Sequence, residues 1–144
     1  MLIILGSLIA IYLRLNIGRE AVSAWDRWLI HVPFSIYLGW ISVATVANAT
    51  QLLYYLNWGG WGIAPEVWAV IMLIIAAALA LIDNLARGDV GYSLVFVWAY
   101  IGIAVKHGGT PAVMLPAAIL AAVIALMLVA RKPVLQLAKV QVRR

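Results

Sequence analysis

Long stretches without charged residues dominate this sequence and decide what it can fold into. A helix needs about 20 apolar residues to cross the ~30 Å hydrocarbon core of a bilayer, and several stretches approach or exceed that length. Hydrophobic residues make up 67% of the chain and charged residues 10%, whereas a soluble domain is about half apolar and about a quarter charged. A chain of 144 residues has too little interior to bury so much apolar surface. We therefore predict an all-α integral membrane protein.

The predicted architecture is one bundle of four to five transmembrane helices in a single membrane domain, residues 1–144. An apolar segment at residues 1–13 is either a short first span or the end of a truncated longer helix. A signal peptide is disfavoured there, because the segment lacks a charged leading region and a cleavage site before Arg14. A basic tail occupies residues 131–144, and the main spans are expected at residues 28–53, 66–85, 90–105 and 111–130.

Basic residues are distributed very unevenly between the two ends of the predicted bundle. If five segments cross, one end carries nine of the ten Lys and Arg residues, and the other end carries Lys106. Because Lys and Arg are enriched in cytoplasmic loops, we predict an inner (plasma) membrane protein with its N-terminus outside and its C-terminus cytoplasmic. The formal charge of +5 then reflects topology, so the lipid bilayer is the expected partner and nucleic acid is not. The nine are Arg14, Arg19, Arg27, Arg87, Arg131, Lys132, Lys139, Arg143 and Arg144.

The residue patterns of an enzyme or a metal site are missing from the sequence. The chain has no cysteine, which excludes thiolate ligands and cysteine nucleophiles. It has no paired carboxylates in one predicted pocket, no nucleophile motif and no phosphate-binding loop. Its acidic residues fall near the ends of the predicted spans, whereas proton and ion pathways place ionisable groups at the bilayer centre. We predict a non-enzymatic protein without a metal site, and a transporter is disfavoured.

Polar residues interrupt the span that begins at residue 28, and this distinguishes it from the others. Ser35, Gly39 and Ser42 recur at helical spacing, and a stripe of small residues lets a second helix approach closely. One interpretation is therefore a helix-packing seam along Ser35, Gly39 and Ser42. The other adds a ligand-binding wall, because Tyr37 and Trp40 beside this seam would suit a flat and mostly apolar molecule.

The run Trp40-Ile41-Ser42-Val43-Ala44-Thr45-Val46-Ala47-Asn48 also resembles the signature of a known family. It is similar to the last helix of the translocator proteins, also called the TspO or peripheral benzodiazepine receptor family, or tryptophan-rich sensory proteins. Pro33-Phe34 stands in for the Pro-Tyr pair of that signature but lies three residues further upstream. In the family, further helices precede this one, so the chain resembles the C-terminal portion of a longer bacterial member.

The resemblance implies a non-enzymatic membrane protein that binds porphyrin-like or other flat hydrophobic ligands. The ligand contacts that it implies are Tyr37, Trp40, Ser42, Thr45 and Asn48. An alternative is a structural accessory subunit of a larger energy-transducing or photosynthetic membrane complex. Its seam would then contact other membrane subunits or a second copy in a homo-oligomer. A neutral histidine can ligate haem iron or a (bacterio)chlorophyll magnesium, and the candidates for a porphyrin or pigment ligand are His31 and His107.

Turn and aromatic residues give further local predictions. Asp89 is expected to cap the helix that begins at Val90, and Ser23 with Asp26 to form a cap before the polar span. Trp98 falls near the middle of its predicted span, so we expect it to face the bundle. An interfacial aromatic belt at one membrane face is predicted for Trp58, Trp61 and Trp68.

Overall fold

The structure, a computed structural model, describes residues 1–20 and 22–141, with side chains as far as residue 130. The described residues form helices and turns and no β-strand, which confirms the all-α prediction. The helices are α1 (Leu2–Arg14), α2 (Ala24–Asp26), α3 (Val32–Tyr55), α4 (Pro65–Ala86), α5 (Val90–Lys106) and α6 (Pro111–Gln141). A π-helical turn, Arg27–His31, joins α2 to α3, and a short 3₁₀ turn, Gly60–Gly62, precedes α4.

The π-helical turn before α3 has a local cause in the sequence. Pro33 lacks an N–H group, and its ring would clash with the carbonyl group four residues earlier in a regular α-helix. The chain accommodates it by widening the preceding turn, where the Val32 N–H group donates to the carbonyl oxygen of Arg27. The helix therefore continues without interruption from Ala24 to Tyr55.

Two predicted helix caps are confirmed. The Asp89 carboxylate accepts hydrogen bonds from the backbone N–H groups of Gly91, at 2.9 Å, and Tyr92, at 3.2 Å. Ser23 Oγ accepts a hydrogen bond from the backbone N–H group of Asp26 at 3.1 Å. Each cap satisfies N–H groups that have no partner within their own helix, which fixes where the helix begins.

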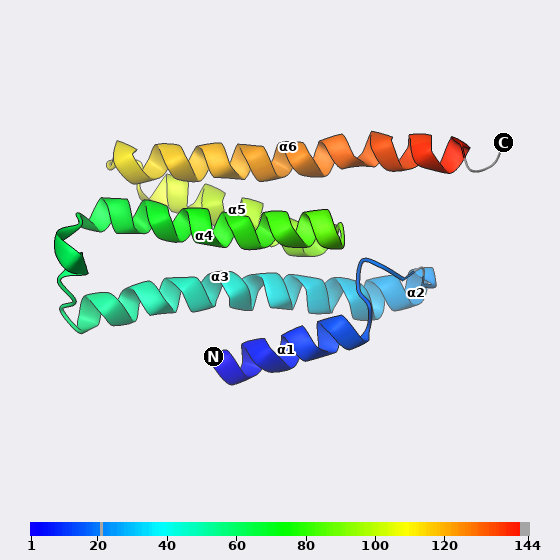
Figure 1. Cartoon of the computed structure of the whole chain (residues 1–144), viewed down its shortest axis with the longest axis horizontal. Coiled ribbons are helices and arrows are strands. Elements are labelled where there is room, and N and C mark those ends of the chain that lie inside the picture. Colours follow the sequence, from blue (N-terminus) through cyan, green and yellow to red (C-terminus); the bar gives the residue numbers. More distant parts are fainter. Residues whose placement is uncertain (21, 142–144) are drawn as a thin grey trace.

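Helix α3 lies between α1 and α4, while α5 and α6 complete the other side of the bundle (Figure 1). The predicted seam residues Ser35, Gly39 and Ser42 are buried, and α5 packs against that side of α3. A methyl group added to Gly39 would lie 3.0 Å from the Tyr92 carbonyl oxygen, and one added to Gly91 would lie 3.1 Å from Ser35 Cβ. Small side chains therefore set the short distance between the two helices.

The short helix α1 is fastened to the turn between α4 and α5 by a polar cluster. The Tyr12 hydroxyl group lies 2.9 Å from Asp83 Oδ1 and 2.8 Å from Asp89 Oδ2. Arg87 stacks over the Tyr12 ring at 5.0 Å and donates a 3.0 Å hydrogen bond to the carbonyl oxygen of Ile17. These contacts hold α1 although it is only 13 residues long.

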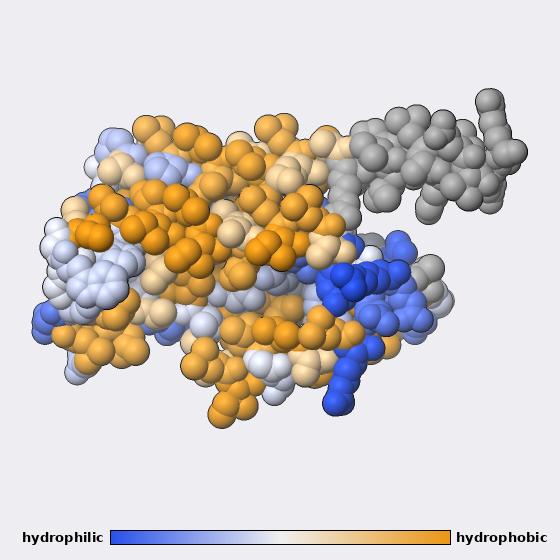
Figure 2. All heavy atoms as spheres, viewed as in Figure 1, coloured by the Kyte–Doolittle hydropathy of each residue, from blue (hydrophilic) through white to orange (hydrophobic). Residues whose placement is uncertain are grey.

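Among the residues that the structure describes, three helices are long and apolar enough to cross a membrane: Ala24–Tyr55, Pro65–Ala86 and Pro111–Ala130. The apolar helices α1 and α5 have 13 and 17 residues, so the number of four to five spans stays a prediction. Figure 2 shows apolar side chains over most of the visible face, with hydrophilic residues gathered where α1 ends. The basic side chains predicted for the tail, residues 131–144, lie outside the described side chains.

Candidate functional site

The largest hollow that we describe is an apolar groove of about 630 Å³ on the outer side of α3 and α5, which we call the Trp40 groove. Trp28, Ile36 and Trp40 line one wall, because residues four apart lie on the same face of a helix. Leu94, Val95 and Trp98 of α5 line the other wall. All residues that line the groove are apolar, so it offers aromatic faces and aliphatic surface to a ligand but no charged group.

The two indoles of the groove face each other from different helices. The ring centroids of Trp40 and Trp98 lie 5.5 Å apart with an interplanar angle of 49°. Trp40 is 46% exposed and Trp98 is 63% exposed. The prediction that Trp98 faces the bundle is therefore wrong, because Ser93, Phe96 and Tyr100 occupy the buried side of α5. Trp98 joins Trp40 as a groove residue, which was not predicted from the sequence.

Two other residues of the implied ligand set lie in a different place. Ser42 and Thr45 line a second groove, of about 360 Å³, between α1, α3 and α4 near the polar cluster of Tyr12. The Ser42 hydroxyl group donates to the Leu38 carbonyl oxygen at 2.7 Å, and that of Thr45 donates to the Ile41 carbonyl oxygen at 2.7 Å. Both hydroxyl protons are thus used within α3.

The remaining residues of this set line neither groove. Tyr37 is 47% exposed, and the exposed Asn48 donates a 2.8 Å hydrogen bond from its side chain to the Ala44 carbonyl oxygen. The structure therefore does not gather Tyr37, Trp40, Ser42, Thr45 and Asn48 around one cavity. Successive residues of an α-helix are rotated by about 100°, which spreads a contiguous motif over several faces.

The two candidate pigment ligands lie at opposite ends of the structure. His31 is 9% exposed and closes the π-helical turn before α3. His107 follows the last residue of α5, and its Nδ1 lies 3.0 Å from the Ile103 carbonyl oxygen. With the proton on Nδ1, the Nε2 atom keeps a lone pair that is available to a metal or a donor. His107 lines a third cleft, of about 290 Å³, together with Lys106.

The predicted belt residues Trp58, Trp61 and Trp68 pack against one another at the end of α3 and the start of α4. Their ring centroids lie between 4.9 and 5.9 Å apart. The Trp68 indole donates a 2.9 Å hydrogen bond to the Gly60 carbonyl oxygen, which fixes the loop between the helices. Trp58 and Trp68 also line a fourth cleft, of about 320 Å³.

The geometry of the grooves does not indicate a protein family, whereas comparison with known proteins does. No curated protein matches the chain, and no solved structure matches it. A family model described as TSPO-like protein matches residues 1–130, which is most of the chain. This match confirms the translocator resemblance of the motif on α3 and extends it over α1 to the apolar part of α6. The chain belongs to the TSPO-like protein family.

Proposed function

We propose that this translocator-like membrane protein binds a flat hydrophobic ligand of the porphyrin class, without catalysis, in the Trp40 groove. The observation that carries the proposal is the pair of indoles, Trp40 and Trp98, on the two walls of an apolar groove of about 630 Å³. That volume falls within the range of about 300–1,000 Å³ that is usual for small-molecule sites.

The chemistry of the groove favours a flat aromatic ligand over a polar one. Aromatic faces stack on extended π-systems, and such contacts contribute about 0.5–1.5 kcal/mol beyond the burial of area. Trp40 and Trp98 remain partly exposed, so a ligand dissolved in the membrane can enter from the side. Of the five contact residues that the family resemblance implies, Trp40 is the one that supports this site.

Titration with protoporphyrin IX, followed by quenching of tryptophan fluorescence, tests the proposal. We expect Trp40→Ala and Trp98→Ala each to weaken binding by about three- to tenfold, because each removes one stacking partner. Trp61→Ala is the matched control, since Trp61 is 81% exposed at the other end of α3 and lies outside the groove. Unchanged affinity in Trp40→Ala, or an equal loss in Trp61→Ala, would contradict the proposal.

The alternative, an accessory subunit of a larger complex, would need an interface other than the predicted seam. Ser35, Gly39 and Ser42 are buried where α5 packs on α3, so this stripe is not available to a second subunit. Gentle extraction from native membranes distinguishes the two roles. A small species that carries a tetrapyrrole absorption band favours ligand binding, and elution with a large complex favours the accessory role.

We further propose that the end of the bundle carrying Arg14, Arg27 and Arg87 faces the cytoplasm. The proposal rests on the sequence, which predicts nine basic residues for that end and Lys106 for the other; of the nine, Arg14, Arg19, Arg27 and Arg87 have described side chains. Because the chain has no cysteine, Arg19→Cys and Gly109→Cys report each end separately. A membrane-impermeant maleimide should label Gly109→Cys in intact cells and Arg19→Cys only after permeabilisation. The reverse labelling pattern would show that the bundle has the opposite orientation in the membrane.

A further inference from the structure

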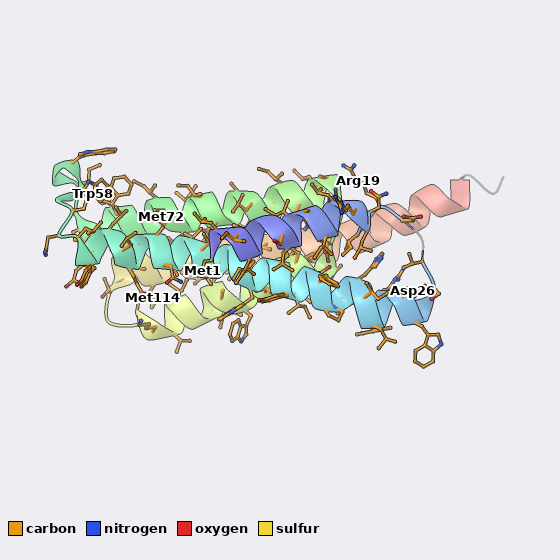
Figure 3. All side chains as sticks on the ribbon, turned by 90° about the horizontal axis from the view of Figure 1, so that it is seen from below. Met1, Arg19, Asp26, Trp58, Met72 and Met114 are labelled. Carbon is orange, nitrogen blue, oxygen red and sulfur yellow. The ribbon has the colours of Figure 1, made fainter. Side chains whose placement is uncertain are left out.

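The third cleft described above is lined by α3, α4, α5 and α6, and we call it the Lys106 cleft. It lies apart from the Trp40 groove and shares no lining residue with it. It occupies about 290 Å³. Met72 of α4 lines it, toward the end of the bundle that carries Trp58 (Figure 3). Lys106 and His107 line it where α5 ends, so the cleft has one charged end.

The cleft is long for its volume. Phe96, which is fully buried, lines its inner part, and Lys106 lies ten residues later on the same helix. At 1.5 Å per residue this separation corresponds to about 15 Å along the helix axis. Three helices contribute alanines where larger side chains would fill the space: Ala47, Ala69, Ala76 and Ala99. The result is a hollow suited to a slender ligand.

The hydroxyl groups along the walls already have partners. Tyr100 donates a 2.5 Å hydrogen bond to the Leu73 carbonyl oxygen, and Thr50 donates a 3.1 Å hydrogen bond to the Val46 carbonyl oxygen. The inner part therefore offers hydrocarbon and no free hydroxyl proton. The charge at the other end comes from Lys106, which is the only Lys or Arg between Arg87 and Arg131.

We propose that the Lys106 cleft binds a single-chain amphiphile with a carboxylate head, that is, a fatty acid anion. The carboxylate pairs with the Lys106 ammonium group beside His107, and the acyl chain extends along α5 toward Phe96. A volume of about 290 Å³ fits one chain better than a broad ring system or a two-chain lipid. Charge complementarity selects the head, because a lysine is a compact cation that binds anions.

Because the ligand binds from a membrane, its head group must supply most of the binding selectivity. An acyl chain loses little by remaining among lipid tails, which are as apolar as the cleft, so burial of the chain adds little net affinity. Selectivity must then come from the pairing of the carboxylate with Lys106. Lys106 is exposed, so this pairing should give a several-fold preference for the carboxylate rather than the larger gain of a fully buried charge pair. Removal of the ammonium group should therefore reduce binding markedly.

The test uses the full chain in phosphatidylcholine nanodiscs and palmitate that carries a photoreactive diazirine near the end of its chain. We expect cross-links to map to the inner lining, around Leu73 and Phe96. Lys106→Gln should reduce labelling by about three- to tenfold. Arg14→Gln, which removes an exposed cation at the opposite end of the bundle, should leave labelling unchanged. Unlabelled palmitate should compete, and hexadecanol should not.

Four outcomes would overturn the inference. Full labelling of Lys106→Gln, or competition by hexadecanol equal to that by palmitate, would show that the head group is not recognised. Competition by hexadecyl phosphate much stronger than by palmitate would assign a phosphate head instead. Ala99→Phe is a second variant, because it fills the cleft and retains Lys106. It should lose labelling while its protoporphyrin affinity stays unchanged, and persistent labelling would place the acyl chain elsewhere.

Discussion

Gly39 is the position at which a single methyl group should test the packing of α3 on α5 most directly. A Cβ atom there would lie 3.0 Å from the backbone oxygen of Tyr92 and 3.1 Å from Cβ of Val95. A backbone oxygen in a helix cannot move aside as the end of a flexible side chain can. Gly39→Ala therefore forces the two helices apart or distorts one of them.

The magnitude follows from comparison with a glycine that has room. Gly102 lies within α5, and a Cβ atom added there meets nothing within 4 Å. Replacement of a helical glycine by alanine stabilises by about 0.5–1 kcal/mol through helix propensity, and both variants share this gain. Overpacking costs about 1–3 kcal/mol, and only Gly39→Ala incurs it. We expect the free energies of unfolding of the two variants to differ by about 1–3 kcal/mol.

Reversible unfolding in mixed micelles, followed by tryptophan fluorescence, measures this difference. Gly102→Ala should be as stable as the unchanged protein or slightly more stable, and Gly39→Ala should be less stable than both. If the two variants unfold at the same denaturant concentration, α3 and α5 are not held at the distance that the seam implies. The assignment of Ser35, Gly39 and Ser42 to a packing seam would then be refuted.

Three further predictions concern contacts between distant parts of the chain. Tyr12→Phe removes the hydroxyl group that bridges two carboxylates, and should cost about 1–3 kcal/mol and expose α1 to faster hydrogen exchange. Trp68→Phe removes the indole hydrogen bond to Gly60, and should lower the unfolding free energy by about 1 kcal/mol. Gly18→Ala should cost about 2 kcal/mol or more in the same assay, because φ is +83° and the added Cβ would lie 2.7 Å from the Arg87 carbonyl oxygen.

The helices could be predicted from sequence because each depends on local patterns. Uninterrupted apolar runs and the cap at Asp89 are properties of neighbouring residues, and the structure has helices in all the segments where they were expected. The extension of the polar helix back to Ala24 depends on the Ser23 cap, which is also local. The cluster around Tyr12 was not foreseen, because its partners Asp83 and Asp89 lie 71 and 77 residues away in the sequence.

The candidate site was harder to predict because the motif on α3 is contiguous in sequence but not in space. Trp40 and Ser42 are two residues apart, which places their side chains about 200° apart around the helix axis. Trp40 accordingly lines the groove shared with α5, and Ser42 lines the groove near α1. The second wall of the Trp40 groove comes from Trp98, whose position depends on how α5 rotates. No periodicity within α3 contains that information.

The seam and the Trp40 groove have a common origin in the packing of α3 on α5. Gly39 admits the backbone of α5, and the adjacent Trp40 is too large to enter the same contact, so it lies at the edge of the interface. Trp98 lies at the corresponding edge of α5, three residues after Val95, which contacts the seam. The distance between the two indoles is therefore set by the small residues beside them. It follows that Gly39→Ala should change porphyrin affinity as well as stability although Gly39 touches no ligand, whereas Gly102→Ala should alter neither the seam nor the groove.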